Sequence, residues 1–333
     1  MPQTFSKTAS HLIQLCTRQP MATPVDMTDR HVIVTGASPN SIGFETARIL
    51  AGWGATVVAT CVRNVPLMES SLKDELRKIG ASGNNITAHR LDLCDPDSVN
   101  GFAAWYREKH PDKLHVLVNN AGIHRKTLTP RKEPLFAENG REIHWRTNYL
   151  GAFHLTWALL PLLQASGLES ADARVVNVSS GLHDRVGNDY LFTDMALCHS
   201  WDAYGLSKLA MIHMACEIER RFGESYNLHA VAVHPGVVMT NLTLPYAFRG
   251  RMGKAVHRIS SALTSLVLLS PYAGAQTTVM CASTKSLQGG KYYERCAIAE
   301  PTADSQDEAV SKRLWDQSEH WVRTLPNAVG NVH

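Results

Sequence analysis

Short apolar runs alternate with longer stretches of helical periodicity along most of the chain. The run at residues 31–35 stops at Gly36, as a buried parallel strand does, and residues 42–53 then place apolar side chains three and four positions apart. The same two patterns predict further strands over 55–59, 86–93, 114–119, 174–179 and 228–234, and helices over 66–79, 96–109, 142–163 and 203–222. Alternating strands and helices require a parallel sheet that is covered on both faces. We therefore predict a single doubly wound, Rossmann-type α/β domain with about seven strands.

Three segments lie outside the regular alternation of strands and helices. Residues 1–30 form a polar N-terminal extension, which is either an unstructured tail or an element packed on the domain. The domain is expected to span residues 31–310, and residues 311–333 are expected to form a C-terminal tail. Residues 237–280 have helical character and follow the end of a strand, so we expect a small lid over the ligand crevice at the carboxyl edge of the sheet.

Composition and charge exclude several classes of protein. Hydrophobic residues make up 44% of the 333 residues, which is enough for a large core. The formal net charge of +3 comes from scattered positive residues, whereas nucleic-acid binding needs a clustered basic surface. No run reaches the ~18–20 apolar residues that a membrane span requires. We expect no nucleic-acid partner and no membrane span.

Cysteine and histidine are distributed without metal-binding spacing. The seven cysteines occur singly, without a CxxC pair, and the sixteen histidines form neither an HxxxH nor an HExxH pattern. Single scattered cysteines are typical of reduced thiols in the cytoplasm rather than of disulfides or zinc sites. We therefore expect a cytoplasmic protein without a metal site.

A glycine-containing segment joins the first strand to the first helix. Its sequence is Thr-Gly-Ala-Ser-Pro-Asn-Ser-Ile-Gly, from position 35 to position 43. Small residues let backbone N–H groups approach a pyrophosphate, whose charge the N-terminus of the helix favours. The first glycine supports the tight turn, and the second lets the helix pack closely on the strand. The segment therefore predicts a dinucleotide site that includes Gly36, Ser38, Asn40, Ser41, Ile42 and Gly43.

The end of the second strand indicates which dinucleotide binds. An acidic residue there bonds the ribose hydroxyls of NAD and repels a 2′-phosphate, whereas an arginine does the opposite. Residues 59–64 contain Arg63 and no acidic residue. NADP (NADPH) is therefore favoured over NAD, and a solvated loop arginine is the alternative interpretation of Arg63.

Tyr204 and Lys208 carry the candidate chemistry. A spacing of four residues on a helix places both side chains on one face, one turn apart. A phenol with its ordinary pKa of ~10 is a poor base at neutral pH, but a nearby ammonium group and a positive nicotinamide ring lower that pKa. Tyr204 then exchanges the alcohol proton while hydride passes between carbon and nicotinamide. A surface pair on a helix is the alternative interpretation of this spacing alone.

The motifs occur in an order that resembles a known family. The glycine-containing turn is followed by Leu-Asp-Leu around Asp92, Asn-Asn-Ala-Gly ending at Gly122, a strand ending at Ser180, the Tyr204–Lys208 pair and Pro-Gly-Val-Val-Met-Thr ending at Thr240. This series resembles the short-chain dehydrogenase/reductase family. The turn departs from the family pattern, because one residue is inserted and Asn-Ser replaces the middle glycine.

Within that family the chain is most similar to the retinol dehydrogenase and WW-domain oxidoreductase-like branch. The similarity rests on the long interval between Ser180 and Tyr204, on the Ser-Lys-Leu-Ala run that contains Lys208, and on residues 270–276 ahead of Gly-Lys-Tyr-Tyr at 290–293. The resemblance implies an enzyme that oxidises a CH–OH group or reduces a C=O group with a nicotinamide cofactor.

The resemblance also implies roles for single residues. Ser180 bonds the substrate oxygen, with Ser179 as the alternative, and Lys208 holds the nicotinamide ribose and tunes Tyr204. Asn148 distorts its helix and supports a proton relay through a water molecule. The expected catalytic residues are therefore Asn148, Ser180, Tyr204 and Lys208. Cofactor contacts are implied for Asp92 and Leu93 beside the adenine ring, and for Asn120, Ala121, Gly122, Pro235, Gly236, Val238 and Thr240.

The sequence thus predicts an NADP-dependent alcohol dehydrogenase or ketoreductase for a small hydrophobic ketone, aldehyde or secondary alcohol. Leu242, Leu244 and Tyr246 in the expected lid offer an apolar pocket wall, although such residues are also typical of a core. Two alternatives stay open: a NAD(P)-sensing protein without turnover, and an epimerase or dehydratase on the same scaffold. The protein could form a homo-oligomer under any of these three functions.

Overall fold

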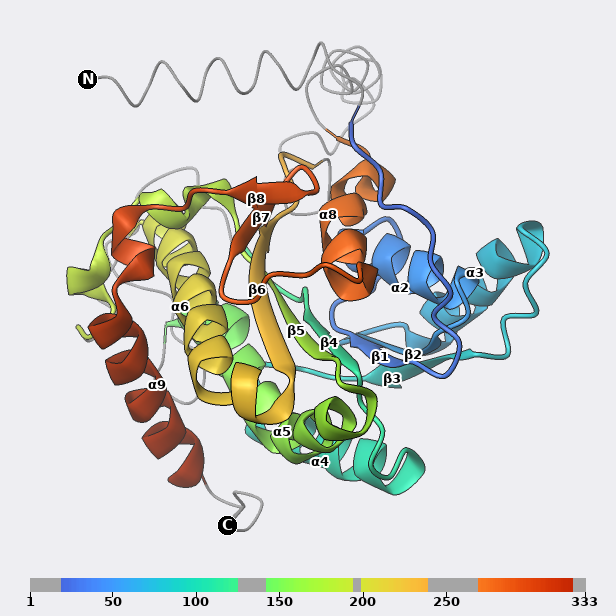
Figure 1. Cartoon of the computed structure of the whole chain (residues 1–333), viewed down its shortest axis with the longest axis horizontal. Helices are drawn as coiled ribbons and strands as arrows, with labels where there is room; N and C mark the ends of the chain where they lie inside the picture. Colours follow the sequence, from blue (N-terminus) through green and yellow to red (C-terminus); the bar gives the residue numbers. More distant parts are fainter. Residues whose placement is uncertain (1–18, 125–141, 194–198, 239–268, 326–333) are drawn as a thin grey trace, which may run out of the picture.

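A sheet of eight strands forms the centre of the protein (Figure 1). The computed structural model describes residues 19–124, 142–193, 199–238 and 269–325. The strands are β1 His31–Val34, β2 Thr56–Cys61, β3 Ile86–Arg90, β4 Val116–Asn119, β5 Ala173–Val178, β6 Leu228–His234, β7 Tyr292–Glu294 and β8 Ala297–Ala299. They lie in the order β3-β2-β1-β4-β5-β6-β7-β8, and every neighbouring pair is parallel except β7 with β8. The predicted doubly wound α/β fold is confirmed, with eight strands where about seven were expected.

Helices cover both faces of this sheet (Figure 1). One face carries α2 Ile42–Gly52, α3 Val65–Lys78 and α8 Pro271–Ser283. The other carries α4 Pro96–Lys109, α5 Gly151–Ser170 and α6 Ser200–Tyr226, with α9 Glu308–Arg323 packed outside α6 and α5. Shorter segments are the π-helical turn η1 Trp145–Leu150 and the 3-10 turns η2 Gly181–Asp184, η3 Asn188–Tyr190 and η4 Ala303–Gln306.

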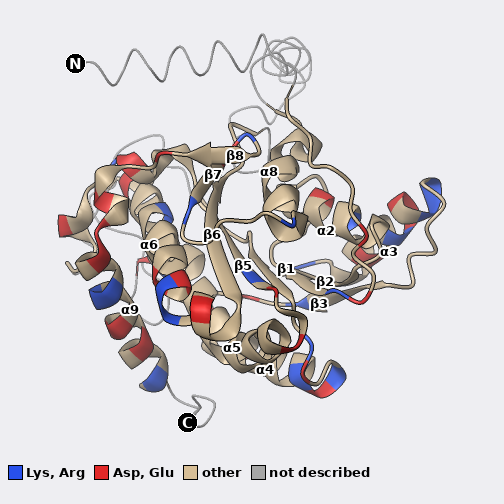
Figure 2. Cartoon of the chain, in the orientation of Figure 1, with Lys and Arg blue, Asp and Glu red and all other residues tan. Residues whose placement is uncertain are grey.

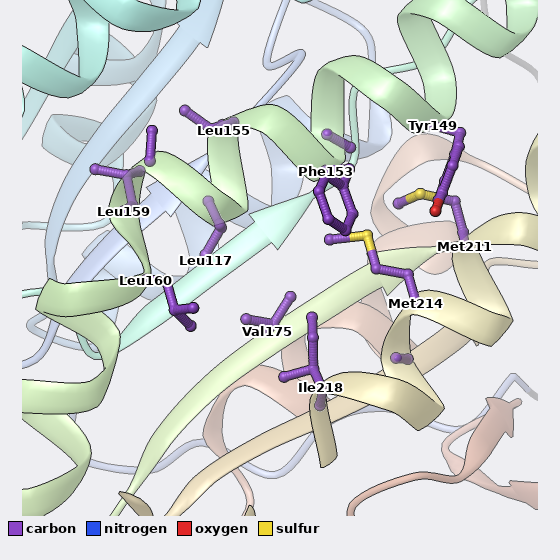
Figure 3. Packing of buried hydrophobic residues seen from close by; sticks show 14 of the residues in the cluster. Leu117, Tyr149, Phe153, Leu155, Leu159, Leu160, Val175, Met211, Met214 and Ile218 are labelled. Carbon is purple, nitrogen blue, oxygen red and sulfur yellow. The ribbon is translucent and has the colours of Figure 1, made fainter. Parts of the chain in front are cut away.

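The central strands are buried on both sides because their side chains alternate between two cores. In β1, Val32 and Val34 join the core beneath α2 and α8, whereas Ile33 joins the core beneath α4, α5 and α6. Figure 3 shows part of the second core, where Phe153 of α5 and Met214 of α6 point toward one another. Burial on both sides is the reason why continuous apolar runs mark these strands in the sequence.

The helix predicted over residues 142–163 has different bounds in the structure. Residues Trp145–Leu150 form a π-helical turn, and the Glu142 carboxylate accepts the Trp145 backbone N–H at 2.9 Å. The α-helix then continues to Ser170, because small polar residues near its end are also buried. The Ser166 hydroxyl, for example, accepts a backbone N–H from the segment before β4 at 2.8 Å. Such residues give no apolar periodicity from which a helix end could be predicted.

Both ends of the described chain pack on the domain. Within the predicted N-terminal extension, the Ala22 backbone N–H donates to the Gln276 side chain of α8 at 3.0 Å. Residues 311–323, which were expected in a C-terminal tail, belong to α9, and its Leu314 and Trp315 are buried. Figure 2 shows charged residues along the outer side of this helix. Since α9 is polar over most of its surface, its sequence alone resembles that of a tail.

The lid predicted over residues 237–280 lies mostly outside the described residues. Its last part, from Pro271 onward, forms α8, which packs against α2 on one face of the sheet. Ser270 caps this helix by accepting the Ala273 backbone N–H at 3.2 Å. The residues of the predicted lid that belong to α8 therefore form part of the core.

Candidate active site

A cavity of about 1100 Å³ opens at the carboxyl ends of the central strands. Parallel α/β sheets bind ligands at this edge, beside the point where the strand order reverses, here between β1 and β4. Many of the residues predicted from the sequence line it: Gly36, Ser38, Ser41, Ile42, Arg63, Asp92, Leu93, Asn120, Ala121, Gly122, Tyr204, Lys208 and Pro235. Residues that are far apart in the sequence thus meet at one hollow. A second hollow of about 900 Å³, between α9 and η1, contains none of them.

The turn after β1 brings backbone close to the cavity. Gly36 has a φ of +69°, and a Cβ atom there would lie 2.7 Å from the Cα atom of Ala121. A Cβ atom on Gly43 would lie 2.6 Å from the Gly36 carbonyl oxygen. Asn40 has a φ of +62°, a left-handed conformation that asparagine adopts more readily than most residues. Both glycines of this turn are therefore required by close packing.

Asn120 ties this turn to the end of β4. Its Nδ2 donates to the carbonyl oxygens of Thr35 at 2.7 Å and Gly36 at 3.2 Å. The Thr35 hydroxyl in turn accepts the backbone N–H groups of Asn120 and Ala121, each at 3.0 Å. Sequence reasoning missed Thr35, although it is the last residue of the first predicted strand. These bonds hold the glycine-containing turn against the strand end and so shape the floor of the cavity.

The turn leads into the N-terminus of α2, where backbone N–H groups and open space could accept a pyrophosphate. Ser41 caps the helix by accepting the Phe44 backbone N–H at 3.1 Å. The first N–H groups of a helix have no partner within it and favour an anion. Ser38, Ser41 and Ile42 line the cavity beside these groups. The donors and the space together fit the diphosphate of a dinucleotide.

Asp92, Leu93 and Arg63 lie on the β2 and β3 side of the cavity. Asp92 accepts the Cys94 backbone N–H at 3.0 Å and so closes a tight turn. Asp95, and not Asp92, caps α4, by accepting the backbone N–H two residues on at 3.0 Å. Arg63 is exposed, and its guanidinium forms no ion pair with the residues that the structure describes. This side of the cavity therefore offers a ligand a carboxylate and a guanidinium that forms no ion pair within the described part of the chain.

Tyr204 and Lys208 lie one turn apart on α6, as predicted. The Lys208 Nζ is 5.6 Å from the centroid of the Tyr204 ring and donates to the Val178 carbonyl oxygen at 2.8 Å. Burial raises the pKa of Tyr204 to about 12, against the opposing effect of its hydrogen bond with Ser180. Burial also lowers the pKa of Lys208 to about 8. In the protein alone, the pKa of Tyr204 is therefore raised by desolvation, whereas the sequence argument expected a nearby ammonium to lower it.

The two candidate serines after β5 have different surroundings. The Ser179 hydroxyl is buried and donates to the Lys208 carbonyl oxygen at 2.8 Å, so it fastens the end of β5 to α6. The Ser180 hydroxyl accepts the Leu182 backbone N–H at 3.2 Å as the cap of η2 and makes the hydrogen bond with Tyr204. Ser180 is therefore the serine whose hydroxyl lies beside the Tyr204 phenol.

Asn148 lies in the π-helical turn and is fully buried. Its Oδ1 accepts the Ile123 backbone N–H at 2.7 Å, and its Nδ2 donates to the Ile123 carbonyl oxygen at 3.0 Å and to the Ser207 hydroxyl at 3.1 Å. A Cβ atom on Gly122 would lie 3.3 Å from the Lys208 Nζ and 3.5 Å from the Asn148 Oδ1. Asn148 thus connects the segment after β4 to the turn of α6 that carries Tyr204 and Lys208.

The segment after β6 is described only in part. Pro235 lines the cavity, and Gly236 follows with a φ of +79°. Val238 is buried and forms an isolated parallel bridge with Leu269, so it belongs to the structural support of this edge. Thr240, which was predicted to contact the cofactor, lies outside the described residues.

An aromatic group beside Tyr204 was not predicted from the sequence. The rings of His124 and Trp201 lie 3.9 Å apart, measured between centroids, and the His124 ring meets the Tyr204 ring at 5.2 Å in an edge-to-face arrangement. Trp201 stands three residues before Tyr204 on the same helix, and His124 directly follows the cavity-lining Ile123. The helical spacing of Trp201 was the available signal. The two rings thus pack beside the Tyr204 ring at the start of α6.

Two further properties concern the described part of the chain alone. Among residues 19–124, 142–193, 199–238 and 269–325, no cluster of histidine, cysteine, aspartate or glutamate has the arrangement of a metal site. None of the helices in these ranges is long and apolar enough to cross a membrane.

Comparison with known proteins gives a consistent result. Residues 30–247 match the family model described as "short chain dehydrogenase". Retinol dehydrogenase 11 from Homo sapiens is 34% identical over 306 residues, which cover 88% of this chain and 86% of that protein. Polyprenol dehydrogenase from Mus musculus is 37% identical over 298 residues, which cover 86% of this chain and 82% of that protein.

Two solved structures share the fold. A putative short chain dehydrogenase from Pseudomonas syringae gives a TM-score of 0.62 at 22% identity, over 84% of this chain and 99% of that one. L-Sorbose reductase from Gluconobacter frateurii, solved with NADPH and L-sorbose, gives a TM-score of 0.61 at 19% identity, over 81% of this chain and 97% of that one.

Fold, cavity and comparisons define an oxidoreductase with a nicotinamide cofactor that acts on CH–OH or C=O groups. The chain belongs to the short-chain dehydrogenase family. Within it, the chain lies in the retinol dehydrogenase-like branch, given its identity to such proteins over most of its length. The family and the branch predicted from the sequence are confirmed.

Proposed function

We propose that this protein is an NADP-dependent alcohol dehydrogenase or carbonyl reductase for hydrophobic substrates, with Tyr204 as the group that exchanges the substrate proton. The observation that carries the proposal is the arrangement at the cavity wall. The Tyr204 phenol makes a hydrogen bond with Ser180, and the buried Lys208 ammonium lies one helical turn further on.

The choice of NADP rests on the β2 end of the cavity. Arg63 is the charged residue that follows β2, and no acidic residue stands between Cys61 and Asn64 to repel a 2′-phosphate. An arginine fork binds a phosphate through charge-assisted hydrogen bonds. When bound, the nicotinamide supplies or takes up the hydride. Asp92 and the N-terminus of α2 would hold the adenosine and the diphosphate.

Proton exchange falls to Tyr204. Since burial holds its pKa at about 12, the phenol is protonated at neutral pH and serves as the proton donor in the direction of reduction. The Ser180 hydroxyl, which already bonds the phenol, orients the carbonyl oxygen of the substrate. The Val178 carbonyl fixes the Lys208 Nζ, and a pKa of about 8 leaves most of that amine charged at pH 7. Asn148 completes the proposed set by supporting a relay through water from the Lys208 end.

The proposed substrate class follows from the surface beside Tyr204. The aromatic rings of His124 and Trp201 lie next to Tyr204, with His124 in ring contact with both. Retinol dehydrogenase and polyprenol dehydrogenase, which are named for apolar alcohols, are among the similar proteins. We therefore include hydrophobic ketones, aldehydes and alcohols as substrates. A cytoplasmic location is part of the proposal, because the five cysteines in the described part of the chain are free thiols.

The test combines cofactor binding with turnover. Fluorescence titration is expected to show tighter binding of NADPH than of NADH, and NADPH is expected to be consumed with apolar ketones and aldehydes. Tyr204→Phe is expected to bind NADPH as the wild type does and to lower kcat by at least about a hundredfold, the scale of general-acid catalysis. Tyr106→Phe is the matched control, since that hydroxyl bonds the Lys113 carbonyl far from the cavity at 3.1 Å.

The other outcomes assign other functions. Tight NADPH binding without turnover across a broad panel would identify a cofactor-sensing protein. Conversion of a substrate without net consumption of NADPH would identify an epimerase or dehydratase. Full activity in Tyr204→Phe would contradict the role of the phenol.

A further inference from the structure

A fully buried arginine lies behind the adenine side of the cavity. Arg146 belongs to the π-helical turn η1, and its side chain is among the largest in the protein without exposed surface. Its Nη1 donates to the Leu93 carbonyl oxygen at 2.7 Å, and Leu93 lines the cavity. Burial of a charge is costly unless the charge is paired and hydrogen-bonded, so this placement requires a reason.

Arg146 is charged, and its one hydrogen bond is directed at the cavity wall. Burial lowers its pKa to about 10, against the opposing effect of Cys94, Asp92 and Asp95 nearby, so it is protonated at neutral pH. Its Nε and Nη2 make no hydrogen bond with the residues that the structure describes. A residue kept only for packing would not need a guanidinium here, since an apolar side chain of similar length would avoid the cost of burial.

The Leu93 carbonyl is held from a second direction as well. Gly151, the first residue of α5, packs directly against it and leaves no room for a Cβ atom. The turn that follows Leu91 is closed by the bond from the Cys94 N–H to the Asp92 carboxylate at 3.0 Å. Arg146 and Gly151 thus fix the backbone of this turn, and the turn determines where Asp92 and Leu93 stand in the cavity.

Helix α9 covers the other side of the guanidinium. The Arg146 Cζ lies 5.0 Å from the centroid of the Trp321 ring, a cation–π contact. One turn earlier on α9, Ser318 exchanges a hydrogen bond with the Tyr149 hydroxyl of η1 at 2.8 Å. Through the Trp321–Arg146 contact an outer helix, which Figure 1 shows on the outside of α6, is connected to the Leu93 carbonyl at the cavity wall.

We propose that Arg146 is a positioning residue for the adenosine half of the cofactor and that Trp321 holds it in place, so that the docking of α9 sets the affinity for NADP. This inference rests on the proposed function, because it takes NADP as the ligand. Arg146 acts through Leu93 and Asp92 and touches neither the substrate nor the reacting atoms. Its loss relaxes the turn beside the adenine ring and leaves the nicotinamide side unchanged.

The experiment separates the two halves of the cofactor. Calorimetric titration of the full chain with NADPH, adenosine 2′,5′-bisphosphate and reduced nicotinamide mononucleotide gives three dissociation constants. Arg146→Met is expected to weaken binding of the first two about tenfold, the effect of losing one charge-assisted hydrogen bond, and to leave the third unchanged. It is also expected to raise the KM for NADPH while kcat at saturating NADPH stays as in the wild type. Arg146→Lys, which keeps a charged donor, is expected to recover part of the affinity.

A pair of variants on α9 tests the second half of the proposal. Trp321→Leu is expected to weaken binding of NADPH and of adenosine 2′,5′-bisphosphate about threefold, within the range of a single cation–π contact. Arg323→Met removes a different cation–π contact of α9, with the Trp157 ring of α5 at 5.2 Å, and is expected to leave both affinities unchanged. Should Arg146→Met fail to fold, this pair carries the test.

The contrary results are distinct. Equal weakening of all three ligands by Arg146→Met, or no weakening of adenosine 2′,5′-bisphosphate, overturns the positioning role. Equal effects of Trp321→Leu and Arg323→Met overturn the role of Trp321. Failure of the wild-type protein to bind NADPH overturns the proposed function, and this inference with it.

Discussion

Two side chains on one helical turn show how burial and charge compete at single residues. Desolvation favours the neutral form of both Tyr204 and Lys208, raising one pKa and lowering the other. The Ser180 hydroxyl opposes this effect on the phenol, and the Val178 carbonyl accepts a bond from the amine. At neutral pH the Tyr204 phenol is thus protonated, and beside it the Lys208 ammonium loses its proton more easily than an exposed lysine does.

The lowered pKa of Lys208 has a consequence for stability. The unfolded chain binds the lysine proton up to a pKa of about 10.5, whereas the folded chain releases it near 8, so folding is favoured as the pH rises through this interval. Between pH 7.5 and 9.5 the free energy of unfolding of the wild type should rise by about 2 kcal/mol relative to Lys208→Met. Urea denaturation at several pH values measures this difference. Lys312→Met, at an exposed position on α9, should show no such change.

Arg63 makes a testable contribution to cofactor preference. Arg63→Glu replaces a phosphate ligand by a group that repels the 2′-phosphate and bonds the ribose hydroxyls. NADPH affinity should fall by about tenfold or more, since charge-assisted hydrogen bonds are lost, while NADH affinity should rise or stay constant. Fluorescence titration with both cofactors measures the change. Arg90→Glu, an equal change of charge at the end of β3 outside the cavity lining, should leave the ratio unaltered.

Among the elements, the π-helical turn η1 has the greatest influence on the site. It carries Asn148, which bonds the segment after β4 and the start of α6 simultaneously. It also carries Arg146, which bonds the turn after β3. A π-helical turn adds one residue to the helical repeat and so directs both side chains toward the strand ends. Two side chains of this turn, Asn148 and Arg146, therefore hold the exits of β4 and β3 and one turn of α6.

Removal of the Asn148 amide tests this role. Asn148→Ala leaves the partly buried N–H and C=O of Ile123 without this partner, so the free energy of unfolding should fall by about 1–3 kcal/mol. Turnover should fall as well, because the segment before Lys208 loses its support. Asn85→Ala is the control, because it removes a side-chain amide that donates two hydrogen bonds, to the Ala51 and Ala55 carbonyl oxygens at 2.8 Å each, away from the cavity. Thermal unfolding and activity assays compare the two variants. An equal loss of turnover in both would contradict the role of Asn148.

The sequence predicted those elements whose burial follows a regular pattern. The apolar runs of β1 and β5 are buried on both faces, and α6 places Tyr204 and Lys208 on one side by its period. The strands β7 and β8 have three residues each, which is too short for a period to show. Arg146 could not be identified as buried, because an arginine in a sequence indicates exposure unless its partners are known. Its partners, Leu93 and Trp321, are remote in the chain.

At the scale of the whole molecule, α9 completes the second core. Its Trp315 packs edge-to-face on Phe153 of α5 at 4.9 Å and meets Phe222 of α6 at 5.8 Å. The guanidinium of Arg221 lies over the same ring at 5.3 Å. The core beneath α5 and α6 is therefore completed by α9, the last described helix, which begins about 150 residues after the start of α5.

Truncation of this ring should cost much of the stability of the domain. Trp315→Ala removes a large buried side chain and should lower the free energy of unfolding by about 3–5 kcal/mol. Leu168→Ala, at a leucine that is 60% exposed on α5, should change it by less than about 0.5 kcal/mol. Denaturant titration compares the two. A small effect of Trp315→Ala would mean that α9 is dispensable for the fold.

The strand order has a consequence for how the chain is made. β1 lies between β2 and β4, and β4 begins at Val116, more than eighty residues after β1 ends. While the ribosome extends the chain through β2 and β3, the other edge of β1 has unpaired backbone groups beside apolar side chains. Such edges pair readily with other chains. A strand that is interior in the finished sheet, third of eight in the order, is thus an edge strand until β4 emerges.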